Sequence, residues 1–307
     1  MRHLLALALV LLGCREQDAE LDDARPDSDG YPYPPPRTDV FPAIGSADTL
    51  EIATWNIENF PLMSISPART ADLITSLDLD VIVVEEIASD TAWRELLDRL
   101  REHDGVLSDH RYSPTEYQKI GVIYRATMVI PGPIRLLFPT ESFVFPRPPV
   151  SVELAIDDGV HRTLALEVIG LHLKAGGTTE DGERRRAAIE QLDAHIRAQV
   201  DGGGEDEIVI AGDFNEVLTT VQGQTNFAAF LGAPDRYTIR TQAAAEAGQI
   251  TFVPSQRFID HIATTAGLED ELGGSTIVIP RLHTLPGYVP EVSDHLPVVL
   301  VVPQLAR

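Results

Sequence analysis

The segment Ile208-Val-Ile-Ala-Gly-Asp-Phe-Asn215 is a short apolar run that stops at a carboxylate and an amide. β-Branched residues dominate its first half, which predicts a buried strand. Asp213 and Asn215 stand two positions apart, so in an extended chain both side chains point to the same face. The segment therefore predicts a strand that delivers two polar groups at its end.

Similar apolar runs recur from about residue 49 onwards. The expected strands span 50–57, 80–87, 119–125, 150–156, 163–173, 206–212, 258–263, 275–279 and 296–302. Because several of them are apolar throughout, both faces of their sheets should be covered. Together with the helices between them, they predict one α/β (α+β) domain over residues 49–307.

Amphipathic helices are expected between these strands. Ser66 is expected to cap the first helix, with a proline at the first helical position. The second helix follows Asp90. The third spans about 183–200, with Thr179 or Asp181 as its cap.

The chain begins with the features of an export signal. Arg2 precedes the apolar run 4–12, which is too short to cross a bilayer core of ~30 Å as a helix. We therefore expect residues 1–13 to be a signal peptide. The run ends in Leu11-Leu-Gly-Cys14, which resembles a bacterial lipobox and implies lipidation of Cys14; a chance cysteine after an ordinary signal peptide is the alternative. The expected product is exported and lipid-anchored to the bacterial cell envelope, at the periplasmic face or the cell surface.

Residues 14–48 are rich in acidic residues and proline, and include the run Tyr31-Pro-Tyr-Pro-Pro-Pro36. They show neither a helical nor a strand period. Such a segment cannot bury enough apolar area to offset its ordering entropy. It predicts an acidic, Pro-rich tether that acts as a spacer; a binding site for a partner domain is the alternative.

The chain is strongly acidic, with 24 Lys and Arg against 47 Asp and Glu and a net charge of −23 at pH 7. This charge excludes the binding of nucleic acid through a broad basic surface. An anionic substrate must therefore be met by a few local cations or by metal ions. The single cysteine, Cys14, excludes an internal disulfide framework and a cysteine-based zinc site.

Side chains suited to metal or phosphate binding recur where the predicted strands stop. They are Asn56, Glu86, His172, Asp213, Asn215, Asp260, Asp294 and His295. One such residue alone is more often a turn former or a structural histidine. Their recurrence in chain order, with hard oxygen ligands dominating, favours one shared site.

These residues lie in motifs that resemble a known family. The motifs are Thr54-Trp-Asn-Ile-Glu-Asn-Phe60, Val83-Val-Glu-Glu-Ile87, Gly170-Leu-His-Leu-Lys-Ala175, Gly212-Asp-Phe-Asn215, Phe258-Ile-Asp-His261 and Ser293-Asp-His-Leu-Pro297. In this order they resemble the endonuclease/exonuclease/phosphatase superfamily, over residues 50–302. The resemblance implies a DNase I-like four-layer sandwich, in which two mixed β-sheets pack face to face with helices on the outer faces.

The resemblance also implies metal-dependent hydrolysis of phosphoesters. Asn56 and Glu86 would bind the metal ion, with Asp294 nearby. Mg²⁺ is expected because it prefers carboxylate and water oxygens, with Mn²⁺ or Ca²⁺ as alternatives.

The other motif residues would act on the substrate. By resemblance, Asp213 orients or deprotonates the attacking water, and Asn215 holds a phosphate oxygen. His295 would be an acid/base or phosphate contact whose tautomer is set by Asp260. His172 would help to bind or protonate the scissile phosphate.

Two cations beside a motif, Lys174 and Arg185, are candidate phosphate contacts; a solvated helix start is the alternative for Arg185. Gln118 stands where the DNase I branch has an acidic partner for its extra histidine. This departure leaves the partner of His172 open.

Further polar residues near the motifs are expected to be structural. Glu85 is expected to be an ordinary neighbour of the site or an exposed side chain. His261 lies on the opposite strand face from the residue before it and should pack in the core. His195 and His283 are given no role.

Three functions remain open. The motifs favour an exported, monomeric, metal-dependent phosphodiesterase, foremost an endonuclease acting on DNA or RNA. One alternative is a phospholipase C- or sphingomyelinase-like hydrolase, for which segment 138–145 with its phenylalanines is the candidate lipid-inserting loop. The other is a non-catalytic surface lipoprotein that uses the fold as a binding module.

Overall fold

The computed structural model describes residues 30–113, 116–157 and 163–303. The expected signal peptide (1–13), Cys14 and the tether as far as residue 29 lie outside the described residues, so these remain predictions. Within the described part of the chain, no helix is long and apolar enough to cross a membrane.

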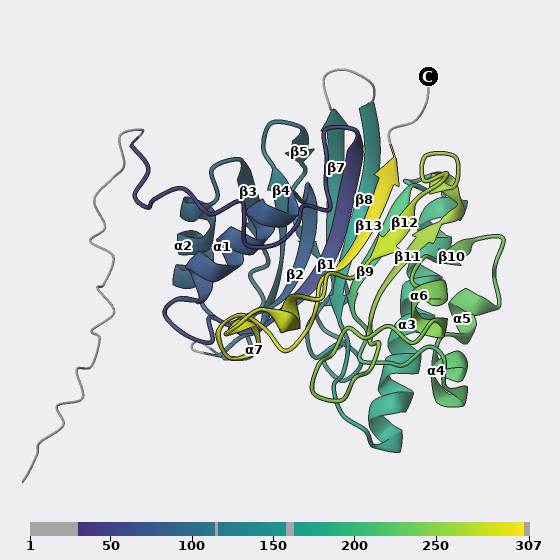
Figure 1. Cartoon of the computed structure of the whole chain (residues 1–307). Coiled ribbons are helices and arrows are strands. Elements are labelled where there is room, and N and C mark those ends of the chain that lie inside the picture. Colours follow the sequence, from purple (N-terminus) through teal and green to yellow (C-terminus); the bar gives the residue numbers. More distant parts are fainter. Residues whose placement is uncertain (1–29, 114–115, 158–162, 304–307) are drawn as a thin grey trace, which may run out of the picture.

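The strands form two sheets (Figure 1). The six-stranded sheet has the order β12 (Thr276–Val278), β13 (Val298–Pro303), β1 (Thr49–Phe60), β2 (Val81–Ile87), β4 (Lys119–Arg125) and β3 (His103–Leu107). The seven-stranded sheet has the order β10 (Tyr237–Ile239), β11 (Asp260–Thr265), β9 (Ile208–Asp213), β8 (Thr163–His172), β7 (Val150–Asp157) and β5 (Val129–Pro131), with β6 (Arg135–Leu136) also paired to β7. β1 runs parallel to β2 and β8 parallel to β9, whereas the other neighbours are antiparallel, so both sheets are mixed.

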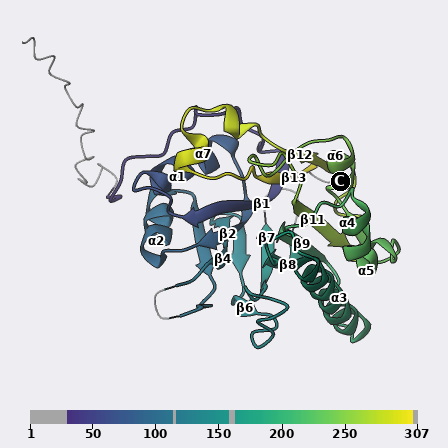
Figure 2. The ribbon, with the colours of Figure 1, turned by 90° about the horizontal axis from the view of Figure 1, so that it is seen from below.

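Helices lie on the two outer faces (Figures 1 and 2). α1 (Ser66–Leu77) and α2 (Asp90–Arg99) cover the six-stranded sheet, and α3 (Thr179–Asp201) covers the seven-stranded sheet. The remaining helical elements are short: α4 (Val221–Asn226), α5 (Ala228–Leu231), α6 (Gln242–Glu246), α7 (Tyr288–Glu291) and the 3₁₀ turns η1 (Ala266–Leu268) and η2 (Leu282–Thr284).

The central core follows from the alternation of side chains along each strand. Val83 of β2 and Val209 of β9 belong to one buried cluster between the sheets. Their neighbours turn the other way, so Ile82 packs with α1 and α2, and Ile210 packs with α3. The predicted DNase I-like four-layer sandwich is therefore confirmed.

Two predicted helix caps differ from the structure. Ser66 is the first residue of α1 and not its N-cap, because its hydroxyl donates to the carbonyl of Glu291 at 2.7 Å. The cap of α3 is Thr178, and its hydroxyl exchanges hydrogen bonds with Asp181 in a capping box. The hydroxyl of Ser66 forms a tertiary hydrogen bond instead of capping α1. The cap of α3 lies one residue before Thr179, the nearer of the two expected positions.

The described part of the predicted tether, residues 30–48, packs on the domain. Three of its apolar side chains lie half-buried against the core cluster that includes α1: Val40, Phe41 and Ile44. The amide of Ile44 donates to the carbonyl of Leu77 at the end of that helix. This stretch is therefore a strap held on the outer face and not a free spacer, because its few apolar side chains find a complementary surface.

Candidate active site

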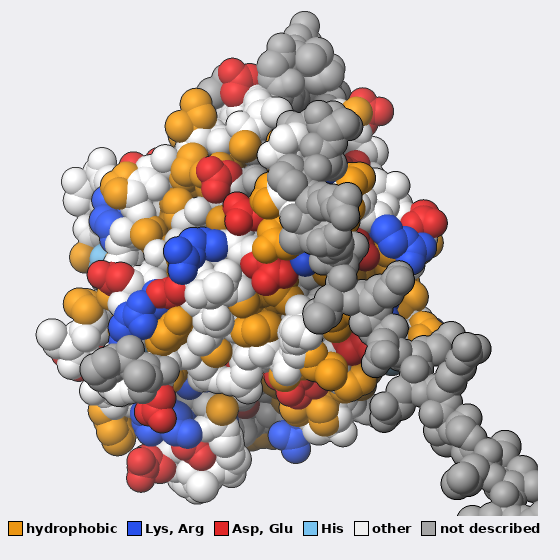
Figure 3. All heavy atoms as spheres, turned by 90° about the vertical axis from the view of Figure 1, so that its left-hand side faces the viewer, with side chains coloured by type: hydrophobic (Ala, Val, Ile, Leu, Met, Phe, Trp, Pro, Cys, Tyr) orange, Lys and Arg blue, Asp and Glu red, His pale blue; other side chains and the backbone are white. Residues whose placement is uncertain are grey.

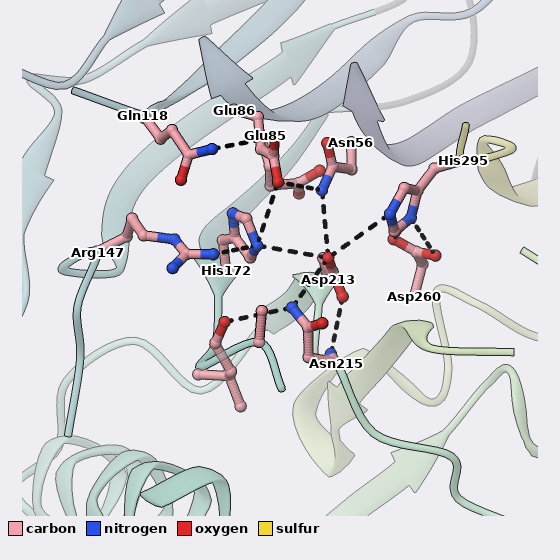
Figure 4. Close-up of polar contacts among 12 residues, drawn as sticks. Asn56, Glu85, Glu86, Gln118, Arg147, His172, Asp213, Asn215, Asp260 and His295 are labelled. Atoms are coloured by element: carbon pink, nitrogen blue, oxygen red, sulfur yellow. Dashed lines mark hydrogen bonds and ion pairs between the residues drawn. The ribbon is translucent and has the colours of Figure 1, made fainter. Parts of the chain in front are cut away.

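The predicted site residues meet at one end of the sandwich (Figure 4). The parallel strands β1 and β2 end near Asn56 and Glu86, and the parallel strands β8 and β9 end at His172 and Asp213. Asp260 opens β11 directly opposite Asp213. Because parallel strands share one carboxyl edge, residues far apart in sequence come together there.

The backbone at these strand ends is unusual. Glu86 has φ 63° and Asn215 has φ 52°, in the left-handed region that non-glycine residues rarely adopt. Gly212 has φ 155°, and a Cβ there would collide with the carbonyl oxygen of Leu171. Such conformations concentrate at functional sites. Here they turn the polar side chains off the strand faces and into a common space.

Two carboxylates share the amide of Asn56. Its Nδ2 donates to Oε1 of Glu86 and to Oδ2 of Asp213, both at 3.2 Å. Asp213 also accepts from the backbone N–H of Asn215 at 2.7 Å and from its Nδ2 at 3.1 Å. Asn56 thus joins the six-stranded to the seven-stranded sheet at the centre of the site.

The carboxyl group of Asp213 is buried beside other acids. Burial raises its pKa from the usual value to about 7, and the nearby charge of Asp260 adds to this. A carboxyl group that releases its proton near neutral pH suits a general base.

His295 and Asp260 form a hydrogen-bonded pair. Nδ1 of His295 lies 3.0 Å from each carboxylate oxygen of Asp260. Burial lowers the pKa of His295, but the charge and hydrogen bond of Asp260 outweigh it and raise the pKa to about 10. The other nitrogen, Nε2, lies 3.9 Å from Oδ2 of Asp213. The pair therefore presents a charged imidazole N–H to the same space as Asp213.

The partner of His172, which the sequence left open, is Arg147. Nη2 of Arg147 lies within hydrogen-bond distance of Nε2 of His172, and both side chains are buried. Nε2 of His172 also lies 3.4 Å from Oδ2 of Asp213 and 3.7 Å from Oε1 of Glu86. Burial, reinforced by the charge of Arg147, lowers the pKa of His172 well below its usual value. His172 is thus a neutral imidazole.

Gln118 bonds to Glu86 and Asn59, whereas the acidic residue at this place in the DNase I branch pairs with the extra histidine. Its Nε2 donates to Oε2 of Glu86 at 3.1 Å and to Oδ1 of Asn59 at 2.7 Å. The backbone N–H of Asn59 donates to the same Glu86 oxygen at 2.9 Å. Gln118 therefore orients a predicted metal ligand.

Glu85 is buried beneath the site, so of the two expectations the neighbour of the site is confirmed and the exposed side chain is wrong. It accepts from the hydroxyl of Thr54 at 2.7 Å, and its other oxygen has no hydrogen-bond partner. Burial raises its pKa well above the usual value, so the side chain is a neutral acid. The strand bulge next to it turns Glu86 outward and leaves Glu85 facing the interior.

His261 packs in the core, as predicted. It contacts the rings of Phe214, Phe227 and Phe258, and its Nε2 lies 3.0 Å from the carbonyl of Glu216. Burial lowers its pKa to about 4.

The two cations predicted as phosphate contacts, Lys174 and Arg185, have other partners. Arg185 is buried, and its Nε contacts Glu216 at 2.9 Å while Nη1 donates to the carbonyls of Lys174 and Gly176. It therefore supports the loop after His172 and does not reach into the site. Lys174 forms an ion pair with Asp181 at 3.0 Å.

Asp294 has a neighbour that the sequence interpretation missed. The backbone N–H of Asp294 donates to Oε2 of Glu58 at 2.9 Å. Burial raises the pKa of both carboxyl groups, and the nearby charge of Glu86 contributes to each. Glu58 therefore belongs to the acidic rim of the site.

Comparison with known proteins identifies the family. The sequence model of the Endonuclease/Exonuclease/phosphatase family matches residues 53–295, a range that contains all of these site residues. The chain belongs to this family. Its members are hydrolases that act on phosphoester bonds. A comparison with curated protein sequences gives no match.

Solved structures of the endonuclease/exonuclease/phosphatase fold align over most of the chain. D. rerio TDP2 complexed with a single-strand DNA product has a TM-score of 0.59 at 14% identity, covering 82% of this chain and 98% of the other. The 3′ phosphatase NExo from Neisseria, bound to a product DNA hairpin, has a TM-score of 0.57 at 17% identity, covering 82% and 98%. A mannosyl-6-phosphatase from Bacteroides thetaiotaomicron has a TM-score of 0.57 at 13% identity, covering 82% and 99%. At these identities the likeness shows the shared fold.

The donor set of the site fits the divalent-metal dependence that is general in this family. Asp213, Asp260 and His295 offer ligand atoms within 4.8 Å of one another. Because His295 is already bonded to Asp260, the oxygens of Glu86 and Asp213, which share Nδ2 of Asn56, are the better donors for a hard cation. The oxygen of Asn56 accepts from the backbone N–H of Glu58 at 3.0 Å and would join them when the side-chain amide is turned. Buried carboxyl groups held this close either keep a proton or need a cation to offset their charge.

Arg147 and Glu58 are the functional candidates that the sequence interpretation missed. Arg147 follows Pro146 in a loop before β7, where an arginine looks like any solvated side chain. Glu58 lies two residues after Asn56, inside a quoted motif, and that spacing was the available signal.

Proposed function

We propose that this protein is an exported, divalent-metal-dependent phosphodiesterase that hydrolyses DNA or RNA, with Mg²⁺ as the preferred ion. The convergence of Asp213 with the Asp260–His295 pair supports this proposal most strongly, because it sets a base opposite a charged N–H donor. Export and anchoring through Cys14 belong to the same proposal and rest on the N-terminal sequence. The enzyme would act as a monomer.

Asp213 would orient and deprotonate the attacking water. Its Oδ1 is occupied by the backbone N–H of Asn215, which directs Oδ2 toward the centre of the site. Proton transfer to a positioned base typically contributes about 10²- to 10⁴-fold to the rate.

His295 would donate from Nε2 to a phosphoryl oxygen as negative charge builds on it. Asp260 holds Nδ1, so the imidazole cannot rotate and keeps its charge. This division of roles resembles that of a carboxylate and histidine in other hydrolases.

Arg147 and Asn215 would hold the remaining phosphoryl oxygens. Arg147 presents a planar guanidinium at the edge of the site, a good match for a phosphate. A bound divalent ion would supply Lewis-acid polarisation of the phosphate and lower the pKa of a water ligand. Asn56 and Glu86 would hold that ion, with Asp294 and Glu58 nearby.

A nucleic-acid substrate agrees with two structural neighbours whose structures contain product DNA. The face of the molecule seen in Figure 3 gives no support to tight, salt-bridge-driven binding. On the side of the molecule seen in Figure 3, Lys and Arg lie interspersed with Asp and Glu. We therefore expect the phosphate to be recognised inside the site and not by a broad basic face.

The candidate lipid-inserting segment 138–145 is engaged elsewhere. Phe138 and Phe145 stack on each other at 4.8 Å. The exposed ring of Phe143 lies under the guanidinium of Arg184 at 4.6 Å. These contacts leave the lipid hydrolase as the weaker alternative. The intact set of polar contacts in the site argues equally against a non-catalytic binding module.

The deciding experiment compares substrates with the chain from residue 15 onward. Plasmid DNA, RNA and sphingomyelin vesicles are each incubated with Mg²⁺ and with EDTA. The expected result is metal-dependent cleavage of nucleic acid with intact sphingomyelin. Release of choline phosphate with intact nucleic acid would assign the protein to the lipid branch. No cleavage of any of them would contradict the proposal.

A further inference from the structure

Asp260 and His295 are held together by a segment that lies outside the reacting groups. Asp260 opens β11 in the seven-stranded sheet, whereas His295 precedes β13 in the six-stranded sheet. Residues 251–257, between α6 and β11, contact both chain segments.

Thr251 makes the central contacts of this segment. Its side chain is fully buried, and Oγ1 accepts from the backbone N–H of Ile259 at 3.0 Å and of Asp260 at 3.2 Å. Its carbonyl accepts from the backbone N–H of Leu296 at 2.7 Å. One residue thus bonds to the chain at Asp260 and to the chain immediately after His295.

Neighbouring residues reinforce the same junction. The N–H of Val253 donates to the carbonyl of Asp294 at 2.9 Å. The ring of Phe252 packs against the imidazole of His295 with the centroids 4.8 Å apart. The segment also closes on itself, since the N–H of Thr251 donates to the carbonyl of Arg257 at 2.9 Å. It is a small, self-bonded unit and not a loose loop.

We propose that Thr251 is a positioning residue that sets the hydrogen bond between Asp260 and His295. Its hydroxyl holds the backbone that carries the carboxylate, and its carbonyl holds the backbone that carries the imidazole. Catalytic geometry tolerates displacements of only about 0.5 Å, so a link between the two backbones bears directly on the pair. The catalytic part of this inference rests on the proposed phosphodiesterase function.

Three variants test the inference. Thr251→Val keeps the shape of the side chain but removes the acceptor from two backbone N–H groups. Thr251→Ser restores the hydroxyl and loses only a methyl group. Thr265→Val is the matched control at the other end of β11, where the buried hydroxyl accepts from the N–H of Ile208 at 2.8 Å and donates to the carbonyl of Asp206.

The kinetic readout separates positioning from general destabilisation. Assayed well below every unfolding midpoint, Thr251→Val should lose about 10- to 100-fold in kcat with KM changed less than about 2-fold. Thr251→Ser and Thr265→Val should keep most of the wild-type kcat. The inference is overturned if Thr251→Val loses no more than Thr265→Val, or if serine rescues nothing.

A second readout needs no turnover. A carboxylate-bound imidazole N–H gives a far-downfield proton resonance, which a His295→Gln variant assigns. Thr251→Val should shift or broaden this signal, while the Ser and Thr265 variants retain it; an unchanged signal in Thr251→Val contradicts the inference. If the wild-type protein cleaves no phosphoester, the proposed function fails, and this resonance still decides the positioning role.

Thr251→Ala provides a backup if the valine variant does not fold. It removes the same oxygen without forcing a methyl group against the N–H groups. The same loss of kcat and the same change of the His295 resonance are expected. A Thr251→Ala protein with wild-type kcat and resonance would overturn the inference.

Discussion

The role of His172 depends on the charges around it. Nε2 faces the guanidinium of Arg147, and burial together with that charge keeps the imidazole neutral. A neutral ring whose Nε2 already accepts a hydrogen bond has no proton on that atom to give to a phosphate. In the proposed mechanism, His172 therefore orients Arg147. Of the two roles predicted for His172, this favours helping to bind the phosphate over protonating it.

Replacement of Arg147 by methionine tests both the contribution of Arg147 to catalysis and its influence on the pKa of His172. We expect kcat/KM to fall roughly 10- to 100-fold, because a charge-assisted hydrogen bond contributes about 1.5–3 kcal/mol. The pKa of His172 should rise, since the charge that lowers it is gone. Steady-state kinetics and an NMR titration of the histidines check both changes. Arg186→Met, on the half-exposed side of α3, is the control and should alter neither.

Asp213→Asn and His295→Ala should each lower kcat by about 10²- to 10⁴-fold. Thermal unfolding of Asp213→Asn should change little, because Asp213 sits among other buried acids whose repulsion the neutral amide relieves. His295→Ala should unfold at a lower temperature, because it leaves the buried carboxylate of Asp260 without its partner, so its kcat is measured well below its unfolding midpoint. Asp235→Asn and His283→Ala, away from the site, are the matched controls for kinetics and unfolding. Retention of wild-type kcat by either site variant would show that the base and donor are assigned wrongly.

The central strands were predictable because they bury both faces. The segments Val81–Ile87 and Lys119–Arg125 match the predicted runs within one residue. The short edge strand β12 lies within the predicted run 275–279, but the edge strands β3 and β10 were not predicted. β3 reads His-Asp-Gly-Val-Leu and β10 has three residues, so neither carries enough apolar alternation. Both depend on pairing with a neighbouring strand more than on their own pattern.

The strap at residues 30–48 contributes to stability. Phe41 is half-buried against the core cluster that includes α1, so Phe41→Ala should destabilise the fold by about 1–2 kcal/mol, below the about 3–5 kcal/mol typical of a fully buried ring. Urea unfolding measures the change. Asp39→Asn removes only an exposed ion pair with Arg37 and should stay within about 0.5 kcal/mol of wild type. Equal midpoints for Phe41→Ala and wild type would show that the strap does not hold the domain.

The whole molecule keeps several protons that its unfolded chain would release. Burial raises the pKa of Glu51 to about 8, and the pKa of Asp213 is raised to about 7. Asp260 holds the pKa of His295 at about 10. For each group, stability is greatest below its unfolded pKa and is lost as the pH rises through the folded pKa.

Stability of the metal-free protein should therefore fall between pH 7 and pH 9. Histidines with lowered pKa values, such as His261, oppose the change only weakly, because their unfolded pKa of about 6.5 lies below this window. Urea midpoints in EDTA at both pH values measure it, and Glu51→Gln should reduce the difference because it has no proton to lose. A midpoint that is equal or higher at pH 9 would contradict the expected proton balance.

The sequence by itself determined the order of the buried strands and the polar residues at their ends. A strand buried on both faces appears in the sequence as an apolar run, and its end appears as an abrupt change to polar residues. Asn56, Glu86, Asp213 and His295 could be selected on that basis, helped by the resemblance of their motifs. Only the tertiary structure decided which side chains meet. Arg147, which lies far from every motif in the sequence, reaches His172, whereas Arg185, the candidate beside a motif, turns to Glu216. The physical reason is that contacts between the two sheets depend on their stacking and on bends at the strand ends, which no local pattern encodes.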